Sequence, residues 1–512
     1  LVTSASTGDV QPAIRFSNST NITLQHCAAL RLAAANTNSA VVGLGGILIG
    51  TIIRQNEFLG PVGIGNIPGA QPGGAVFAAQ AQPLLTLSLF VEENMLLCSS
   101  RGISLIGVSL HVLETRIAGN FLNDCAQGGI VALGFVPAGS NMNVQCNELR
   151  ASGTGIIIGT SGASITGNSI TAVNQRVSGD GIVLALGLDK TGIDRCHVIG
   201  NRITSIGGIG VSAQAIVKSA MIKNNFVDGA SLGGIVMGDK SSADIIAVEN
   251  NQISNITARS GASKGEVVGI QLVDAQRGEV VNNSISAIGL EANNHRCVGI
   301  ELLASTSLRV SGNEIADIGP AQGNAQISAG VECAGTFEQL DLLDNNVRRS
   351  AKAGQVDSAE WFAVLISGGQ TTPPGFKAMI SLFGAKTNTN FLLFAERLLA
   401  RQIAAETVAL HGNVFDAYGL SAAVRAVLNG FCGFNNNRSR LRGREQPAVE
   451  IAAGAAVLNA NHVQGTQGKS TVILKLPDKG PFTALGNITT HAIEINGAVL
   501  GAPWAPLNVQ AP

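Results

Sequence analysis

Apolar and polar residues alternate over short runs along most of this chain, and stripes with helical spacing are rare. The segment from 201 to 239, NRITSIGGIGVSAQAIVKSAMIKNNFVDGASLGGIVMGD, shows the alternation clearly. A period of two residues is typical of strands that are buried on one face. The pattern therefore predicts many short β-strands joined by turns.

Glycine followed by isoleucine or valine recurs in phase with these runs. The first six glycines of this kind are separated by steps of 26 or 27 residues, and the steps then lengthen. The glycines are Gly102, Gly129, Gly155, Gly181, Gly208, Gly234, Gly269, Gly299 and Gly330. A fixed period in this range indicates a stacked structural repeat. It predicts one solenoid, although 512 residues could otherwise form several globular domains.

An asparagine followed two residues later by an apolar residue is the second mark of the repeat. The set is Asn120, Asn147, Asn168, Asn201, Asn225, Asn251, Asn283, Asn313 and Asn346. Asparagine tolerates the left-handed backbone of a tight corner, and stacked amides can hydrogen-bond to one another. We therefore expect a structural asparagine column, with each glycine serving a corner or a close contact.

A unit of about 26 residues with three short strands fits one turn of a parallel β-helix, with turns stacked about 4.8 Å apart. The alternating GN-x-I and GI-x-L motifs resemble the right-handed parallel β-helix repeats of the bacterial pectate-lyase-like superfamily. The resemblance covers Gly102 to Val347 and resumes from His411 to about Asn496. It implies an all-β fold, a right-handed parallel β-helix (β-solenoid) with capped ends and lateral loop insertions. Superfamily members range from pectin-cleaving enzymes to tailspike adhesins and structural shafts.

Departures from the period predict the domain organisation. We expect an N-terminal cap and first coil at 1–45, regular coils at 46–350, an irregular insertion with imperfect coils at 351–411, further coils at 412–496, and a Pro-rich cap or tail at 497–512 anchored by Trp504. Long loops are expected at 252–268, 284–298 and 314–329, where the interval between the two marks widens. Insertions on one flank of a solenoid often form its binding face.

Composition narrows the function classes. A net charge of −1 gives no reason to expect a nucleic-acid partner, and no apolar run is long enough for a membrane-spanning helix. Eight scattered cysteines without a CxxC pair argue against zinc and for buried thiols, while disulfides between neighbouring coils stay open. The chain starts at Leu1, so an export signal is not observable. The resemblance implies an extracellular or cell-surface location.

The third residue of each Gly-Ile strand should point outward if the isoleucine points inward. Val131, Ile157, Val183 and Val236 then form an apolar outward stripe. Contiguous apolar surface of this kind is usually covered by a loop, another subunit or a partner. The stripe predicts a candidate interface, in a homo-oligomer or with another protein.

Two glutamates in the same outward column are the candidate catalytic residues. Glu301 and Glu332 should lie about one strand spacing apart, roughly 5 Å, after Gln271 on the previous coil. When two carboxyl groups lie so close together, the pKa of one of them is raised. The spacing also matches that of the two carboxyl groups in a retaining glycosidase. His295, in the neighbouring loop, completes the candidate set. The alternative is an exposed, solvated carboxylate column.

The long loops supply the candidate binding residues Gln271, Arg296, Asn293, Asn294, Trp361, Arg259 and Lys264. Asp194, Asp239 and Asp274 could bind Ca²⁺, although a lone aspartate in a turn is more often a turn former. No other cofactor and no other metal are expected. The aspartate and arginine signatures of pectate lyases and polygalacturonases are missing, so the resemblance transfers no catalytic residue.

Two function classes remain. The first is a non-enzymatic β-solenoid, a structural, adhesive or binding subunit of a bacterial surface or phage-tail-like assembly, with a glycan as a candidate ligand. The regular coils and an aromatic content of only 4% favour it, because sugar grooves usually use aromatic platforms. The alternative is a polysaccharide lyase or glycoside hydrolase that acts on an extracellular glycan.

Overall fold

The computed structural model describes residues 2–4, 12–31, 40–66, 84–109, 114–134, 141–150, 153–171, 179–187, 192–238, 243–258, 265–292, 295–320, 327–350, 360–368, 406–419, 421–443, 446–466, 470–478 and 480–511. It divides into two compact units, residues 1–230 and 231–512. The described residues contain strands and one short 3₁₀ helix, η1 (Ala505–Leu507), and no α-helix. No helix among them is long and apolar enough to cross a membrane.

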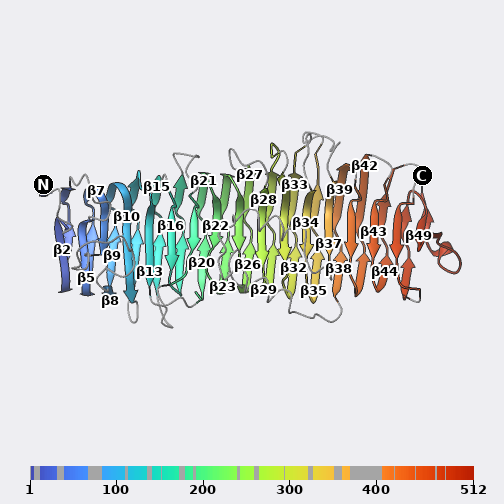
Figure 1. The fold of residues 1–512 in the computed structure, drawn as a ribbon, viewed down its shortest axis with the longest axis horizontal. Helices are drawn as coiled ribbons and strands as arrows, with labels where there is room; N and C mark the ends of the chain where they lie inside the picture. The colour runs from blue at the N-terminus through green and yellow to red at the C-terminus, as the bar shows by residue number, and fades with distance from the viewer. Residues whose placement is uncertain are drawn as a thin grey trace. The chain divides into compact units, whose positions relative to one another are not determined.

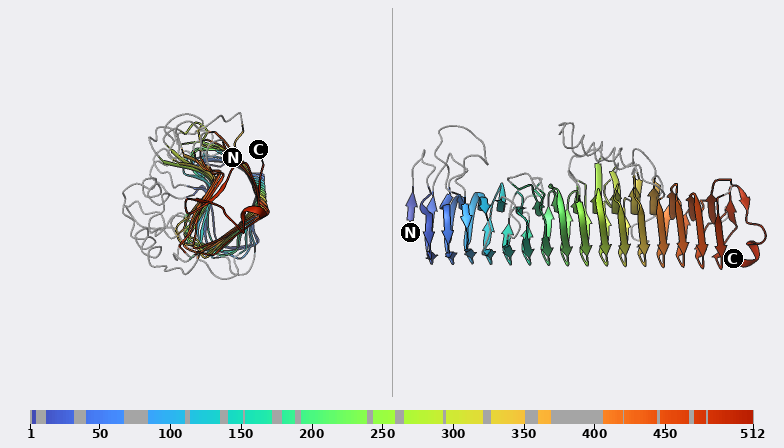
Figure 2. Two further views of the ribbon diagram at one scale, coloured as in Figure 1. Left: turned by 90° about the vertical axis from the view of Figure 1, so that its right-hand side faces the viewer. Right: turned by 90° about the horizontal axis from the view of Figure 1, so that it is seen from below.

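Each coil contributes three strands. In the coil formed by β29 (Ala275–Val281), β30 (Ser284–Ile288) and β31 (His295–Leu303), every strand pairs in parallel with its counterpart in the next coil. We call these three positions the back strand, the ladder strand and the glycine strand. Within each unit, counterpart strands of successive coils lie side by side (Figures 1 and 2). This pairing confirms the predicted parallel β-helix.

The first unit has the following strands. Back strands are β3 (Thr23–Gln25), β6 (Thr51–Arg54), β9 (Leu89–Glu92), β11 (Thr115–Ala118), β14 (Met142–Gln145), β17 (Ala163–Thr166), β20 (Cys196–Ile199) and β23 (Val217–Lys223). Ladder strands are β1 (Val2–Ser4), β4 (Ala28–Arg31), β12 (Phe121–Asn123), β15 (Glu148–Arg150), β18 (Ser169–Thr171), β21 (Arg202–Ile206) and β24 (Phe226–Ala230). Glycine strands are β2 (Ile14–Thr20), β5 (Ala40–Ile49), β8 (Leu84–Thr86), β13 (Gly128–Gly134), β16 (Ile156–Gly159), β19 (Ile182–Leu184) and β22 (Ile209–Ala213). β7 (Glu57–Asn66) and β10 (Met95–Ser109) run through the ladder and glycine positions without a break.

The second unit repeats the scheme. Its other back strands are β26 (Ala243–Glu249), β32 (Ser307–Ser311), β35 (Gln339–Leu343), β38 (Thr407–His411), β41 (Phe431–Asn435), β44 (Ala455–Asn459) and β47 (Phe482–Leu485). Its other ladder strands are β27 (Gln252–Ile256), β33 (Glu314–Ile318), β36 (Asn346–Arg348), β39 (Val414–Gly419), β42 (Arg438–Gly443), β45 (His462–Gln464), β48 (Ile488–Thr489) and β51 (Val509–Gln510). Its other glycine strands are β25 (Gly233–Met237), β28 (Gly265–Val273), β34 (Ile327–Ala334), β37 (Glu360–Ser367), β40 (Val424–Val427), β43 (Val449–Ala452), β46 (Val472–Lys475) and β49 (Ile493–Ile495), and β50 (Ala498–Val499) pairs antiparallel with β49.

Inward-facing aliphatic residues fill the interior of the coils. Ile285 and Ile300 come from neighbouring strands of one coil, and both are fully buried. Burying a side chain of this size stabilises a fold by roughly 1.5–3 kcal/mol. Because the same positions repeat in every coil, each unit has a continuous apolar core.

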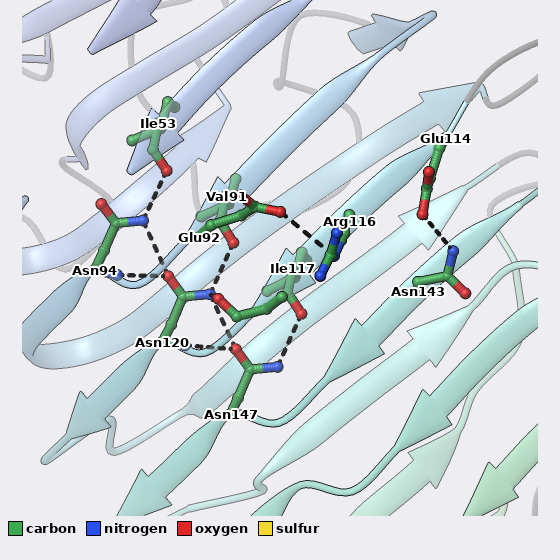
Figure 3. Close-up of polar contacts among 11 residues, drawn as sticks. Ile53, Val91, Glu92, Asn94, Glu114, Arg116, Ile117, Asn120, Asn143 and Asn147 are labelled. Atoms are coloured by element: carbon green, nitrogen blue, oxygen red, sulfur yellow. Dashed lines mark hydrogen bonds and ion pairs between the residues drawn. The ribbon is translucent and has the colours of Figure 1, made fainter. Parts of the chain in front are cut away.

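The asparagine column is a hydrogen-bonded ladder. Asn120 Nδ2 donates to Asn147 Oδ1 at 2.9 Å and to the carbonyl of Val91 at 2.9 Å, and its own Oδ1 accepts from Asn94 (Figure 3). In the first unit the ladder runs through Asn56, Asn94, Asn120, Asn147, Asn168, Asn201 and Asn225. In the second it runs through Asn251, Asn283, Asn313, Asn345, Asn413, Asn437, Asn461, Asn487 and Asn508.

The ladder confirms the predicted column except at one position and in one detail. Asn345 takes the place predicted for Asn346, which instead begins β36 and is half-buried. At every rung of the ladder except Asn508, the left-handed residue is the one before the ladder asparagine, as with Asn282 (φ 55°) and Gly312 (φ 65°). The ladder asparagines therefore act through their amides and not through a left-handed backbone.

The glycine column serves close packing. A Cβ added to Gly299 would lie 2.5 Å from the carbonyl oxygen of Gly330 and 2.8 Å from Ile315 Cγ2. The backbone thus approaches both the next coil and the neighbouring ladder strand too closely for a side chain. In the first unit, however, the register of β22 aligns Val183 with Ser212, so Gly210 and not Gly208 holds the column position.

Two further expectations differ from the structure. Much of the predicted long loops at 252–268, 284–298 and 314–329 is strand, because ladder and glycine strands lengthen there; β31, for example, begins at His295. The tail at 497–512 adds another strand, since β51 pairs with β48 and Asn508 extends the ladder. Trp504 is half-buried against Phe482, with ring centroids 5.8 Å apart. Most of the predicted insertion at 351–411 lies outside the described residues.

All eight cysteines lie in described residues and are free thiols. Six are buried, Cys27 is half-buried and Cys146 is exposed. Burial raises the pKa of Cys196, Cys297 and Cys432 to about 12. These buried thiols act as small apolar side chains in the stack.

Candidate functional site

Long glycine strands in the second unit bring distant charges together. Arg296 and Glu301 are five residues apart on β31, about 16 Å along a straight strand, yet their side chains form an ion pair. Pairing with β28 skips Gly299, since Val298 and Ile300 are in register with Val268 and Ile270. The break at Gly299 lets the two halves of the strand approach each other across their outer face.

One guanidinium holds three carboxylates from three successive coils. Arg296 on β31 pairs with Glu266 on β28, with Glu301 on its own strand and with Glu332 on β34. Gln271 donates to Glu301 and lies 3.5 Å from Glu266. We call Glu266, Arg296, Glu301 and Glu332 the ionic cluster.

The ionic cluster is closed to solvent. Glu301 and Glu332 are 0% exposed, Arg296 is 2% and Glu266 is 3%. Three ionised carboxylates against one guanidinium would leave a net charge of −2. Burial, and to a lesser degree the charge of Glu301, raise the pKa of Glu332, although Arg296 opposes them. Burial acts to lower the pKa of Arg296, but the surrounding carboxylates raise it overall.

The predicted catalytic residues therefore have the expected register but a different environment. Glu301 and Glu332 are direct partners in adjacent parallel strands. They are not the exposed, solvated column that was the alternative, because both halves of each strand enclose them. His295 is 5% exposed, and alternation along β31 places its side chain on the face opposite Arg296.

The predicted binding residues are only partly brought together. Gln271 and Arg296 lie in or beside the ionic cluster. Trp361 is fully buried and donates from Nε1 to the carbonyl of Ile318 at 2.8 Å, beside Arg349. Arg259, Lys264, Asn293, Asn294 and Asp239 lie outside the described residues.

The predicted apolar stripe is mostly covered within the chain. In the first unit Val131 and Val183 are 5% and 4% exposed, and Ile157 is half-buried. In the second unit Val236 is 3% exposed, and a Cβ added to Gly233 would lie 2.9 Å from its side chain. An interface role for these residues stays a prediction, and the surface they offer is small.

A row of arginines on β42 was not predicted from the sequence. Arg438, Arg440 and Arg442 alternate along the strand, so all three point to the outer face. Arg442 pairs with Asp416 and lies over the Tyr418 ring, whereas Arg438 and Arg440 are exposed and have no ion pair among the described residues. The signal was present in the motif NRSRLRG, read with a period of two.

A second ionic group continues the outward column toward the C-terminus. Glu450 pairs with Arg425 at 2.8 Å and with Lys475 at 3.0 Å. Burial acts to raise the pKa of Glu450, but the hydrogen bond from Lys475 and the charge of Arg425 lower it overall. This group is partly exposed and joins β40, β43 and β46.

No group of three or more His, Cys, Asp or Glu side chains within the described ranges is arranged to hold a metal ion. Asp194 accepts from Ser219 Oγ, and Asp274 is buried in a left-handed turn (φ 51°). Both aspartates fit the role of turn formers.

Comparison with protein-family models finds no match, and no curated protein matches the chain. Among solved structures, the crystal structure of the Dettilon tailspike protein (gp208) is similar, with 13% sequence identity and a TM-score of 0.34. The match covers 81% of this chain and 62% of that one, less than two thirds of the tailspike's length. The fold assignment rests on the strand pairing described above, and a likeness of this size carries no conclusion about function.

Proposed function

We propose that the protein is a non-enzymatic β-solenoid that serves as a structural or adhesive subunit of an extracellular assembly. The observation that carries the proposal is the closure of the ionic cluster. Glu301 and Glu332, the best catalytic candidates in the chain, are fully buried and bound to Arg296. A glycosidase needs its two carboxyl groups on either side of an accessible glycosidic bond. Here a guanidinium and neighbouring strands occupy that space.

The first test is a depolymerisation screen. The wild-type protein is incubated with acidic and neutral polysaccharides, with and without Ca²⁺, and its mass in solution is measured in parallel. We expect no cleavage of any polymer. Cleavage that is abolished by Glu301→Gln and by Glu332→Gln, but kept by Glu314→Gln on the exposed part of β33, would refute the proposal and establish the lyase or hydrolase alternative.

The adhesive form of the proposal has a candidate contact surface in the β42 arginine row. Guanidinium groups bind carboxylates in a bidentate manner, and Arg438 and Arg440 are exposed without carboxylate partners among the described residues. Alternate residues of a strand lie roughly 7 Å apart, so the row offers evenly spaced cations. The Tyr418 ring is already in contact with the Arg442 guanidinium, whereas proteins that bind single-stranded nucleic acids stack bases on aromatic rings. An acidic glycan therefore fits this surface better than a nucleic acid.

Binding to polygalacturonate, with dextran as the neutral control, tests this surface. We expect the double variant Arg438→Ala/Arg440→Ala to lose binding that the wild-type protein shows. Arg309→Ala, an exposed arginine on back strand β32, is the matched control and should bind as the wild type does. Equal binding by the double variant and the control would exclude the arginine row as the contact surface, while the structural role would remain.

A further inference from the structure

The ionic cluster contains more negative than positive groups in a place that water does not reach. Among the described residues, Arg296 is the one cation that pairs with its three carboxylates, and Gln271 adds one amide donor. Taking an uncompensated carboxylate out of water costs several kcal/mol, so a buried carboxyl without adequate donors keeps its proton instead. The excess of acids makes the cluster a site where a proton can be retained.

We propose that the ionic cluster holds a proton at neutral pH and that the coils of β28, β31 and β34 consequently become less stable as the pH rises. This inference does not depend on the ligand or on the adhesive role. It concerns how three coils are joined, and it gives the buried charges a role in pH-dependent stability instead of in catalysis.

The contacts single out Glu332 as the group that carries the proton. Glu301 faces both Arg296 and the amide of Gln271, and Glu266 is close to the same two groups. Within the part of the chain that the structure describes, Glu332 pairs with Arg296 alone; its register partner on β31 is Glu301 and its partner on β37 is the apolar Leu365. Glu332 is thus the carboxylate that its described neighbours stabilise least. Burial and the charge of Glu301 raise its pKa, in agreement with this assignment.

The direction of the pH effect follows from linkage. A glutamate in the unfolded chain loses its proton near pH 4.3. Because the folded protein retains the proton above that pH, raising the pH through this interval favours the unfolded state. The contribution of Glu332 to stability is therefore fully present below about pH 4 and declines as the pH rises toward and through the higher pKa of the folded state.

The test compares thermal unfolding of the wild-type protein and Glu332→Gln from pH 4 to pH 9. Glutamine has the shape of the protonated acid and does not titrate, so the variant should gain melting temperature relative to the wild type progressively as the pH rises. Glu314→Gln, an exposed carboxyl on β33 that pairs with Arg348, is the control and should show no such trend. A difference between Glu332→Gln and the wild type that does not change with pH, or that turns against the variant at high pH, would overturn the proposal.

A direct measurement keeps the proposal testable if Glu332→Gln fails to fold. Infrared spectroscopy of the folded wild-type protein at neutral pH should show the carbonyl band of a protonated carboxyl. The band should be absent from the unfolded chain at the same pH. If the folded protein lacks the band, no member of the ionic cluster holds a proton and the inference is wrong.

Discussion

Replacing Asn345 by alanine should destabilise the second unit, whereas the same change at Asn346 should be nearly silent. The two residues are neighbours in sequence and identical in type. Asn345 is 2% exposed and lies in the ladder, while Asn346 is half-buried at the start of β36. Comparing the two variants therefore measures the effect of the ladder hydrogen bonds, because residue type and position in the chain are nearly the same in both.

The hydrogen bonds of Asn345 set the magnitude. Its Nδ2 donates to the carbonyl of Val310 at 2.9 Å and to Asn413 Oδ1 at 3.0 Å, and its Oδ1 accepts from the Asn313 backbone N–H at 3.1 Å and from Asn313 Nδ2 at 2.9 Å. Asn413 Oδ1 keeps a donor in the Asn345 backbone N–H, and Asn313 Nδ2 keeps the carbonyl of Val280. Alanine therefore leaves one buried backbone group without a partner, the N–H of Asn313, because the carbonyl of Val310 stays in the parallel pairing of β32 with β35. At about 1–3 kcal/mol for an unsatisfied group, Asn345→Ala should cost about 1–3 kcal/mol.

Urea unfolding followed by circular dichroism measures the total effect, and hydrogen exchange locates it. Asn345→Ala should speed exchange at the Asn313 amide and on either side of it, in β33 and β36. Asn346→Ala should change the free energy of unfolding by no more than about 0.5 kcal/mol, as surface substitutions outside hydrogen-bond networks usually do. If Asn346→Ala is as costly as Asn345→Ala, or if both are silent, the ladder assignment in this coil is wrong.

Other predictions follow from packing, charge and burial. Gly299→Ala should destabilise the protein by about 1–3 kcal/mol in thermal unfolding because the added methyl meets a carbonyl of the next coil, whereas Gly501→Ala, with no atom within 4 Å of the added methyl, should be neutral; equal effects would refute the close-packing role. Glu450→Gln should remove at most about 1 kcal/mol of stability, present above about pH 4.5 and lost as the pH falls because the pKa of this carboxyl is lowered; a loss that grows in acid would contradict that sign. A thiol reagent should modify Cys146 rapidly in the native protein and Cys297 only after unfolding; rapid native modification of Cys297 would show that its coil is open.

The repeat could be predicted because it consists of residues with a local physical requirement. A glycine such as Gly299 is demanded by the close approach of backbone, and a ladder asparagine such as Asn313 by a backbone N–H of the previous coil, that of Asn283, which donates to its side-chain oxygen. The prediction was wrong at the adjacent pair Asn345-Asn346, because the repeat spacing allows either residue and only the hydrogen bonds distinguish them. A two-residue shift at Gly208 and Gly210 misled it in the same way.

The candidate site was half predictable for a different reason. The register of Glu301 and Glu332 follows from the period, which is local. Their burial depends on the break in strand pairing at Gly299, where Arg296 meets Glu301, five positions further on. Strict alternation cannot predict this contact, because Arg296 and Glu301 are five positions apart and a period of two places them on opposite faces of the strand. An outward column was therefore interpreted as an accessible one.

The ladder also shows how such a chain can change without losing its fold. Asn147 and Asn168 are 21 residues apart and Asn345 and Asn413 are 68 apart. The hydrogen bonds between the side-chain amides of each pair are nevertheless almost equal in length, at 2.9 and 3.0 Å. The amide connection is indifferent to how many residues are placed between two rungs, provided that the strands return to register. Segments can therefore be lengthened, shortened or exchanged between rungs as independent cassettes, and whole coils can be duplicated by joining one rung to the next. The chain thus separates the means of stacking, which repeats from coil to coil, from lateral segments whose length varies between rungs.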